Sequence, residues 1–510
     1  MFRLISFGFD DFMLGHVSSS DFNLVPDIEV KETEYPYTTV LIGENGTGKS
    51  TMLNYISKVF GDLNELKTNQ SEFQRKVKFP YTIQFRVDNK IYVIHQKRER
   101  LGFFYEALIV QLPDEKIIKM VREQVDWSKI ELPNKVIAIS HLPMDRFEKK
   151  VNDVDDFYTY LGMMDSNNTA RPSSKMNKAA RQIFQRIERD KNFNFVRYLL
   201  RFMSFDPDYL SLSTNYRYKN QFFTGQLTSN EFIDLMENWN KFTERKDRPF
   251  SVNYYESNLK SNRNLVEQLV VYMNTRVKQD GIIYGKNTPL EFNIFNNIEL
   301  LEEWRLLEHL RRLDLIENYT LTFRKSRDLF VDDTNLSSGE FNYFSNVVSL
   351  AASIDDNSLV LIDEPETSFH PAWQMKYVNH LKEMLAEYSS SHFVIATHSH
   401  FIVSDLENKS SEVVKISGQV PNIEVEALDL PTYGWSADEI LYKVFKLRTS
   451  RNHFFNYDIT SLGVLLSKEP LPIKEIESYI SLFDKFVLSE EDPLQQMITT
   501  AKKIISNDKS

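Results

Sequence analysis

The stretch LIGENGTGKST, residues 41–51, decides the fold of this chain. Residues 43–50 match G-x-x-x-x-G-K-[ST], the Walker A pattern, whose glycines let consecutive backbone N–H groups converge on phosphate oxygens. The β-branched run TTVLIG (38–43) predicts a buried strand before the loop. After the loop, we expect a helix whose positive end faces the phosphate. Its apolar residues recur at helical spacing: Met52, Leu53, Ile56, Val59 and Phe60.

The residues of this loop have expected roles at a nucleoside triphosphate. Lys49 would reach the β- and γ-phosphates, and the Ser50 hydroxyl would bind Mg²⁺. An ordinary glycine-rich turn is the alternative, but it does not account for the strand before the loop and the helix after it. The residues expected to contact ATP here are Glu44, Asn45, Gly46, Thr47, Gly48, Lys49, Ser50 and Thr51.

Length and composition set the general class of the protein. With 510 residues, of which 42% are hydrophobic, the chain is expected to form two to four domains or one large domain with insertions. Acids interrupt the apolar start before a signal-peptide core is complete, and no window reaches the roughly 18 apolar residues of a bilayer span. The absence of cysteine excludes disulfides and thiolate zinc sites. We expect a cytoplasmic protein that does not enter a membrane.

The net charge of −11 restricts any nucleic-acid contact to a local patch. Three basic clusters are candidates: QKRER (96–100), ERKDR (244–248) and FRKSRD (323–328). Each of them contains an acid, so a solvated surface is the alternative to a DNA contact.

The pattern of apolar residues divides the chain into four parts. After the loop, YTIQFRVDNKIYVIHQ (81–96) alternates as a hairpin does, and KVIAIS (135–140) predicts a buried strand. Helical periodicity prevails from about 150 to 330. α/β alternation then returns with SLVLIDEPE (358–366) and SHFVIATHSH (391–400), two apolar strands with a helix between them. The expected domains are 1–150 with the loop and a β annex, 151–330 as a helical insertion, 331–410 as a return to α/β structure, and 411–510 as a strand pair with a helical extension.

A second element, LVLIDEPE (359–366), supplies carboxylates that the loop requires. The magnesium ion needs an acidic partner, and hydrolysis needs a base near the attacking water. Asp363 would support the metal, and Glu364 would polarise the water. Two solvated acids after a buried strand are the alternative, which the pairing with residues 43–50 disfavours.

A third element, NLSSGEF (335–341), resembles the LSGGQ signature of ABC ATPases. Ser337 and Gly339 match that signature, whereas Ser338 stands in place of its first glycine and Glu340 in place of its glutamine. In ABC ATPases the serine and glycine lie at a helix start and contact the γ-phosphate held by the other subunit. The resemblance therefore implies that these four residues bind ATP across an interface between two copies.

Two further elements follow in the ABC order. ETSFHP (366–371) lies where the family has its D-loop, and IATHSH (395–400) resembles the strand of the switch histidine, with His398 at the matching position. The resemblance covers about residues 1–150 and 330–410. It implies an α/β fold, namely an ABC-type P-loop ATPase head with a mixed sheet flanked by helices, an antiparallel β annex and an inserted helical domain.

The same resemblance implies ATP and Mg²⁺ as cofactors and Lys49, Glu364 and His398 as catalytic residues. His370 is either a D-loop contact or a turn residue before the proline that follows it. His398 and His400 could instead form a metal site at a strand end, but no acid or third histidine lies nearby in the sequence.

The Q-loop glutamine of the family has no clear counterpart. It should follow the β annex, where the chain reads VIAISHLPMDRF (136–147) without a glutamine. Either Ser140 or His141 takes its place, or the loop lies elsewhere.

DEPETSFHPAWQ (363–374) and THSHFIVSDL (397–406) are typical of the SMC/RecF/OLD branch of ABC ATPases. The tail after residue 410 is too short for the two-metal Toprim domain of OLD nucleases, and no sustained heptads predict the coiled coils of SMC-type ATPases. With LPTYGWSADEIL (430–441), the chain resembles the PtuA-type ATPases of Septu and retron antiphage systems. That resemblance implies self-association and control of a separate HNH nuclease, PtuB, with retron RNA or DNA and a reverse transcriptase as further partners.

Two other functions fit the same motifs. One is a RecF- or SMC-like DNA-repair ATPase that acts directly on DNA, with a binding constant that depends steeply on salt. The other is a scaffold that binds ATP and hydrolyses little of it. The sequence therefore predicts an ATPase-type head and leaves its biological role among three alternatives.

Overall fold

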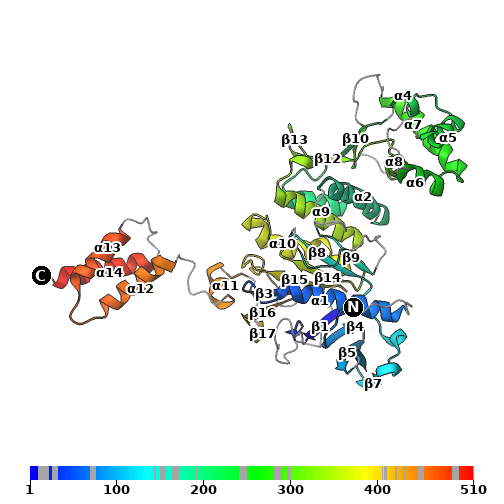
Figure 1. The fold of residues 1–510 in the computed structure, drawn as a ribbon. Coiled ribbons are helices and arrows are strands. Elements are labelled where there is room, and N and C mark those ends of the chain that lie inside the picture. The colour runs from blue at the N-terminus through cyan, green and yellow to red at the C-terminus, as the bar shows by residue number, and fades with distance from the viewer. Residues whose placement is uncertain are drawn as a thin grey trace. The chain divides into compact units, whose positions relative to one another are not determined.

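In a computed structural model of the chain, the described residues form three β-sheets with helices around them (Figure 1). Two compact units are present, Met1–Gly434 and Trp435–Ser510. The basic cluster at 244–248 lies outside the described residues. The structure describes residues 1–9, 22–25, 33–68, 76–100, 102–142, 145–149, 157–162, 172–190, 192–217, 219–239, 250–280, 290–295, 300–404, 406, 410–419, 422–428, 432, 434–435, 437–445, 453–484 and 493–508.

The central sheet of the first unit has the strand order β17-β16-β3-β15-β14-β8-β9. All neighbouring strands are parallel except β17, which runs antiparallel to β16. Every residue of β3, β8, β14 and β15 is buried, which explains why these strands read as apolar runs. The strands predicted from the sequence are confirmed. Their bounds are β3 (Tyr37–Gly43), β8 (Val136–Ser140), β14 (Leu359–Asp363), β15 (His392–Thr397), β16 (Ser411–Gln419) and β17 (Asn422–Leu428). The sheet also contains β9 (Tyr158–Tyr160), which the sequence pattern did not predict.

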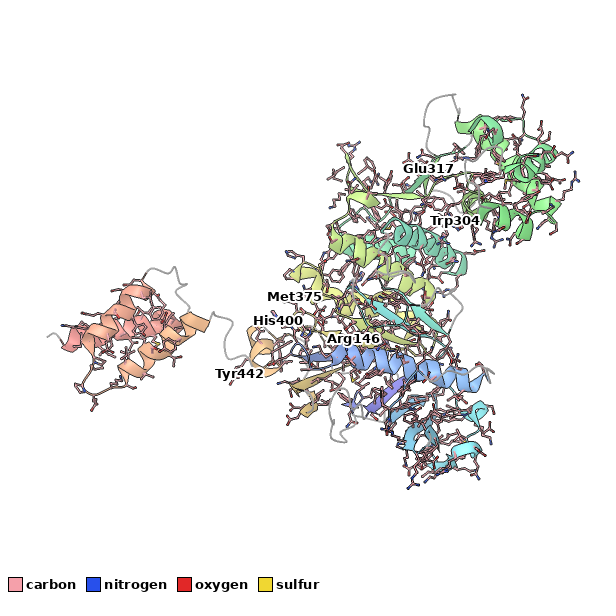
Figure 2. All side chains as sticks on the ribbon, viewed as in Figure 1. Arg146, Trp304, Glu317, Met375, His400 and Tyr442 are labelled. Carbon is pink, nitrogen blue, oxygen red and sulfur yellow. The ribbon has the colours of Figure 1, made fainter. Side chains whose placement is uncertain are left out.

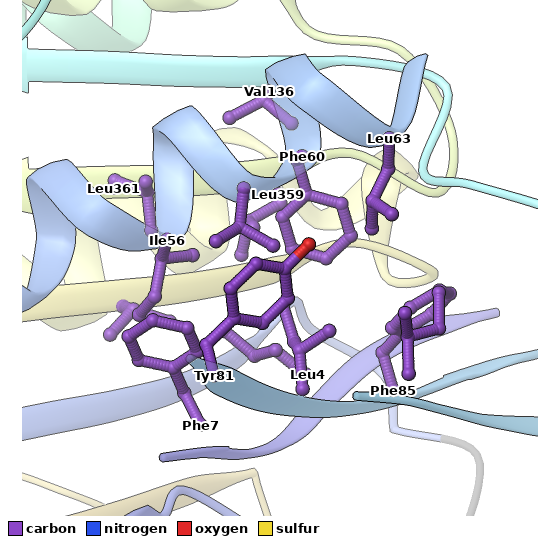
Figure 3. Close-up of a cluster of buried hydrophobic side chains, with 14 of the residues drawn as sticks. Leu4, Phe7, Ile56, Phe60, Leu63, Tyr81, Phe85, Val136, Leu359 and Leu361 are labelled. Atoms are coloured by element: carbon purple, nitrogen blue, oxygen red, sulfur yellow. The ribbon is translucent and has the colours of Figure 1, made fainter. Parts of the chain in front are cut away.

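Helix α1 (Lys49–Lys67) follows the phosphate loop and lies in the main hydrophobic core. The apolar face predicted for it is buried, from Met52 to Phe60. In Figure 3 its residues Ile56, Phe60 and Leu63 lie between Leu359 and Leu361 of β14 on one side and Leu4 and Phe7 of β1 on the other. The helix is therefore fixed on both sides, which holds the loop at its N-terminus in place.

The second sheet is the predicted β annex, with the order β2-β1-β4-β5-β6-β7 and antiparallel pairing throughout. Val87 pairs with Lys90, so the predicted hairpin turns at Asp88 and Asn89. The strands are β1 (Phe2–Phe9), β2 (Phe22–Asn23), β4 (Tyr81–Val87), β5 (Lys90–Glu99), β6 (Gly102–Gln111) and β7 (Lys116–Val121).

The insertion predicted as helical contains helices and, in addition, a four-stranded antiparallel sheet of order β11-β10-β12-β13. The sheet was missed because its pairings join distant segments: Leu210 of β10 lies opposite Phe323 of β12. The strands are β10 (Leu210–Thr214), β11 (Leu290–Asn293), β12 (Thr320–Ser326) and β13 (Leu329–Asp332). The helices are α2 (Pro172–Asp190), α3 (Asn194–Phe202), α4 (Lys219–Phe222), α5 (Ser229–Glu237), α6 (Phe250–Asn258), α7 (Arg263–Asp280) and α8 (Leu300–Arg312).

Two expected domain boundaries differ from the observed structure. The boundary at 330/331 divides the hairpin of β12 and β13. The boundary at 410/411 separates β16 from its parallel partner β3, although both belong to the central sheet. The sequence pattern marks where an apolar run starts, but it does not show which sheet the run joins. The compact units divide after Gly434 instead.

Helices α9 (Ser338–Ser353) and α10 (Pro371–Met384) complete the described part of the head. The second unit contains α11 (Ala437–Lys443), α12 (His453–Leu466), α13 (Ile473–Phe483) and α14 (Pro493–Asp508). Its hydrophobic core includes Leu462, Ile476, Ile480, Phe483 and Ile498. Across the residues that the structure describes, none of the helices is long and apolar enough to cross a membrane.

Candidate functional site

The loop between β3 and α1 has the backbone that its glycines predict. Gly46 and Gly48 have φ values of 85° and 92°, a region in which residues with a Cβ are strained. Gly48 is also the residue that caps the N-terminus of α1. The loop closes on itself because Thr47 Oγ1 donates a hydrogen bond to the Glu44 carbonyl over 2.9 Å.

Lys49, the first residue of α1, turns its ammonium back into this loop. Its Nζ donates to the carbonyls of Gly43 and Glu44 over 2.9 and 3.1 Å. Only 3% of the residue is exposed. Burial lowers the pKa of Lys49 to about 8, although the charges of Glu364 and Asp363 oppose that shift. The ammonium is therefore partly desolvated, and its oxygen contacts are neutral carbonyls rather than anions.

Ser50 and Asp363 meet at the same edge of the sheet. Ser50 Oγ donates to Asp363 Oδ1 over 2.8 Å. Asp363 is the last residue of β14, and burial raises its pKa to about 6 even though the hydrogen bond from Ser50 lowers it. The pairing predicted between Walker A and Walker B is therefore present as a direct side-chain contact.

His398 lies between the lysine and the acid that follows Asp363. It comes directly after β15, the strand between β3 and β14, so the sheet order places its ring between their two loops. The distance from Lys49 Nζ is 2.9 Å to His398 Nε2 and 3.3 Å to Nδ1. From the same Nε2 to Glu364 Oε1 it is 3.1 Å.

Glu364 and Glu366 form a pair of carboxylates with opposite pKa shifts. Burial raises the pKa of Glu364, but the hydrogen bond and charge of His398 outweigh it, so the pKa is lowered. Burial and the charge of Glu364 raise the pKa of Glu366. Glu366 Oε1 also accepts the backbone N–H of His398 over 2.7 Å. Glu366 received no role in the sequence analysis, although the second glutamate of the DEPE stretch was the available signal.

Comparison with protein-family models decides the classification. The model described as the AAA ATPase domain matches residues 22–403, which is more than half of the chain. The chain belongs to the AAA ATPase domain family. Membership of this ATPase domain family implies nucleotide binding, typically with Mg²⁺.

Individual relatives of this ATPase-domain protein are distant. Protein ea59 of Escherichia phage lambda is 26% identical over 199 residues, and the match covers 38% of this chain and 37% of that protein. The chain thus spans little more than a third of the length of that relative.

Solved structures matched to this chain include two heads of SMC proteins. The SMC head domain from Thermotoga maritima shares 8% identity at a TM-score of 0.33, over 84% of this chain and 100% of that one. The second is the Smc head domain from Pyrococcus furiosus, which has an extended coiled coil and is bound to the C-terminal domain of ScpA. It shares 10% identity at a TM-score of 0.32, over 88% of this chain and 100% of that one.

The donor set of the ATPase domain fits magnesium. Mg²⁺ prefers hard oxygen ligands and is usually held by one or two protein oxygens together with substrate phosphates. The hydroxyl of Ser50 and the carboxylate of Asp363 supply two such oxygens in direct contact with each other. A histidine site for another metal is not supported, because the described residues contain no group of three or more histidine or acidic side chains able to hold an ion.

The signature stretch of the ATPase domain starts helix α9. Ser337 is its N-cap: its hydroxyl accepts the N–H of Glu340 over 3.3 Å, while Glu340 Oε2 accepts the N–H of Ser337 over 2.8 Å. This reciprocal capping box was missed, although its S-x-x-E signal is in the sequence. Ser337 and Ser338 are exposed. Gly339 is buried, and a Cβ on it would lie 2.5 Å from the Ser368 carbonyl.

The predicted site residues therefore form two groups. Residues of the phosphate loop lie with Asp363, Glu364 and His398. The signature residues lie apart from them, since among the described residues no hydrogen bond of Ser337 or Glu340 reaches the phosphate loop. Glu340 instead pairs with Lys325 of β12 over 3.0 Å.

His370 is the N-cap of α10 and accepts the N–H of Ala372 over 3.3 Å. Its position favours the interpretation as a turn residue before Pro371. It lies within the stretch expected to be the D-loop, directly before a helix that begins with proline.

The end of β8 and the loop after it contain Ser140 and His141, the two candidates for the Q-loop position. Ser140 Oγ accepts the N–H of Leu142 over 3.2 Å, and His141 is buried with its ring 5.3 Å from that of Phe369. Burial lowers the pKa of His141 to about 3. Arg146, labelled in Figure 2, instead donates from its guanidinium to Thr51 Oγ1 on α1. Arg146 lies in the stretch 136–147, where the Q-loop was expected, but the sequence pattern assigned it no function.

Proposed function

We propose that the protein is an ATP-driven switch that binds ATP with Mg²⁺, self-associates around the nucleotide and hydrolyses it. The observation that carries this proposal is the continuous contact from Lys49 through His398 to Glu364, beside the Ser50–Asp363 pair. A cation, a candidate base and a pair of hard oxygen ligands converge there, which is the set that phosphoryl transfer to water requires.

Binding would replace the carbonyl contacts of Lys49 with phosphate oxygens. A desolvated ammonium gains more from an anion than from a neutral carbonyl, because charge-assisted hydrogen bonds are stronger. Mg²⁺, when held by Ser50 and Asp363, would supply charge neutralisation at the phosphates. The lowered pKa of Glu364 keeps this carboxylate ionised and able to accept the proton of the attacking water.

His398 would orient Glu364 and respond to the nucleotide. In the present geometry its ring contacts both Lys49 and Glu364. When Lys49 moves to a phosphate, the imidazole is free to follow it, and the geometry of the base changes with it. A residue that adjoins both groups is suited to report whether the γ-phosphate is present.

Self-association would complete the site. Exposed Ser337 and Ser338 stand at the N-terminus of the 16-residue helix α9, an end that favours negative charge. We propose that these residues and Gly339 of one copy face the γ-phosphate held by Lys49 of another. This arrangement would convert ATP binding into association of two chains.

The biological role that we propose is control of an associated HNH nuclease in antiphage defence, in a complex of the PtuA type. DEPETSFHPAWQ (363–374) and THSHFIVSDL (397–406) support it, together with LPTYGWSADEIL (430–441). Retron RNA or DNA and a reverse transcriptase are further proposed partners, and the cytoplasm is the proposed location. A DNA-repair ATPase and an ATP-binding scaffold are the competing roles.

One set of measurements separates these roles. Lys49→Ala should abolish binding of a fluorescent ATP analogue, whereas Glu364→Gln should retain ATP and accumulate as a dimer in light scattering. Normal turnover in both variants would exclude the mechanism. Association without phosphate release in the unmodified protein would favour the scaffold, and ATP-dependent DNA binding by the isolated chain would favour the repair role.

A further inference from the structure

Helix α2 carries three cations at intervals of three residues: Lys175, Lys178 and Arg181. We call them the α2 basic row. Lys175 Nζ donates to Asn346 Oδ1 over 2.6 Å, and Arg181 Nε to the Asn177 carbonyl over 3.5 Å. Among the described residues no carboxylate forms an ion pair with any of the three.

Other cations of α2 do have counter-charges. Further along α2, Arg186 pairs with Asp190 and with Glu387. Two cations in the basic clusters expected from the sequence are paired as well. Lys97 pairs with Glu106 over 2.6 Å, and Arg324 pairs with Asp206 over 2.6 Å.

The row is recessed but open to solvent. Burial lowers the pKa of Lys175 to about 7 and also lowers the pKa of Lys178 and of Arg181. Each of the three nevertheless remains half-buried rather than fully enclosed. Cations that have lost hydration without gaining an anion are costly, so an anionic ligand would be bound strongly here.

Two polar side chains beside Lys175, those of His141 and Asn346, have buried atoms without a hydrogen-bond partner. Both ring nitrogens of His141 are buried without a hydrogen bond, and the charge of Lys175 contributes to its lowered pKa, after burial. Asn346, the acceptor for Lys175, has its side-chain amide nitrogen buried without a partner. These polar groups lie beneath the inner end of the row, where they are buried.

Helix α8 extends the positive charge. The two helices are in contact, since the rings of Phe184 and Trp304 stack at 4.0 Å. Arg311 and Arg312 of α8 repel the charge of Arg181, and Glu308 is the acid that they share. In Figure 1, α2 and α8 lie next to each other in the insertion. A chain of net charge −11 thus concentrates cations along one path.

We propose that this path, from Lys175 through Arg181 to Arg312, binds the sugar-phosphate backbone of a nucleic-acid strand. Lys175 and Arg181 are separated by about 9 Å along the helix axis, which is more than one phosphate spans. Cations in a row without base-reading groups between them bind successive phosphates independently of sequence. The site is separate from the ATP site and does not depend on hydrolysis.

The test uses the full chain and a labelled 30-nucleotide DNA strand in fluorescence anisotropy. The double variant Lys178→Gln/Arg181→Gln should weaken binding roughly tenfold and reduce the salt slope by about 1.4, or about 0.7 for each lost phosphate contact. Arg197→Gln/Lys260→Gln is the matched control, because both of those cations are paired with acids and the charge change is the same. Both double variants should keep the basal ATPase rate.

A second readout does not depend on affinity. The chain has no cysteine, so Gln185→Cys, on the exposed side of α2, accepts a single photocrosslinker. It should crosslink to the strand, whereas Lys116→Cys on β7 should not. The proposal is overturned if the strand does not bind, if the control variant loses as much affinity, or if Gln185→Cys gives no crosslink. Inorganic phosphate could also displace the strand when its concentration equals that of the strand's own phosphate groups. That result would overturn the proposal in favour of a small-anion site.

Discussion

The imidazole of His398 lies against the ammonium of Lys49, with 2.9 Å between Nε2 and Nζ. Among the described residues, this ammonium also donates to the backbone carbonyls of Gly43 and Glu44. His398 is therefore the side chain that connects the phosphate loop to Glu364. Strand order explains the contact, since β15 lies between β3 and β14.

Substitution of His398 should slow hydrolysis more than it weakens ATP binding. In His398→Ala we expect kcat to fall about a hundredfold, the lower range for loss of a group that assists proton transfer, with KM changed less than threefold. Steady-state phosphate release measures both parameters. His400→Ala, two residues further on, is the control and should keep kcat. Equal losses in the two variants would show that the loop, and not the ring of His398, matters.

Glu366 should make stability depend on pH. Its raised pKa means that the folded chain keeps a proton that the unfolded chain releases at lower pH, so stability falls as pH rises from about 4.5 towards the raised pKa. Glutamine cannot lose this proton. The melting temperature of Glu366→Gln relative to the unmodified protein should therefore increase between pH 5 and pH 8 in differential scanning fluorimetry.

The control for this measurement is Glu302→Gln, which removes an exposed carboxylate in α8. Its melting temperature should run parallel to that of the unmodified protein over the same pH range. A constant difference between Glu366→Gln and the unmodified protein at all pH values would contradict the assigned shift.

Ser337→Arg should prevent association without affecting nucleotide binding. Ser337 is exposed, and an arginine at this N-cap would add bulk where a second copy is proposed to approach. In the Glu364→Gln background with ATP, light scattering should report a monomer. Ser478→Arg, an exposed serine of α13, should leave the dimer intact. Retained association in Ser337→Arg would place the interface elsewhere.

Gly43→Ala should destabilise the first unit. A Cβ at this position would lie 2.2 Å from the carbonyl oxygen of Ile416 in β16, a backbone atom that moves only if β16 moves. Overpacking of this kind costs about 1–3 kcal/mol. The melting temperature of the first transition should fall, whereas Gly463→Ala, whose Cβ would meet the flexible Met497 at 3.5 Å, should change the second unit little. An unchanged melting temperature would show that β16 adapts.

The local elements of the head were predictable because their signals are local. The loop at 43–50 and the apolar strands before Asp363 and His398 each lie in one short stretch, and parallel strands bring their carboxyl ends to one edge. Contact between Ser50 and Asp363 follows from this order. The sequence was therefore sufficient to predict that Lys49, Ser50, Asp363, Glu364 and His398 lie together.

The remaining features depend on pairings between distant segments. The sheet of β10 to β13 joins residues about 110 positions apart, and neither partner alternates over enough residues to be distinguished from a loop. Glu366 was overlooked because its environment depends on the backbone of His398, 32 residues away. The role of Gly43 was attributed to phosphate alone, because its contact with β16 exists only in the folded sheet.

Arg146 gives the last prediction, since it occupies the region where a Q-loop was expected. Its guanidinium donates to the hydroxyl of Thr51, the residue after Ser50, and its side chain is otherwise exposed. An arginine held at this point adds positive charge beside the residue that follows Ser50 of the phosphate loop. In Arg146→Ala we expect ATP affinity to fall about tenfold, the value of one charge-assisted hydrogen bond, with kcat reduced less than threefold.

Arg146→Lys should recover only part of the affinity, because an ammonium lacks the planar pair of donors. Arg100→Ala, an exposed arginine of the annex, is the control for loss of one positive charge. Titration with a fluorescent ATP analogue measures the affinity, and phosphate release measures kcat. If Arg146→Ala lowers kcat with unchanged affinity, Arg146 acts on the hydrolytic step, as a Q-loop residue would, and the binding role is wrong.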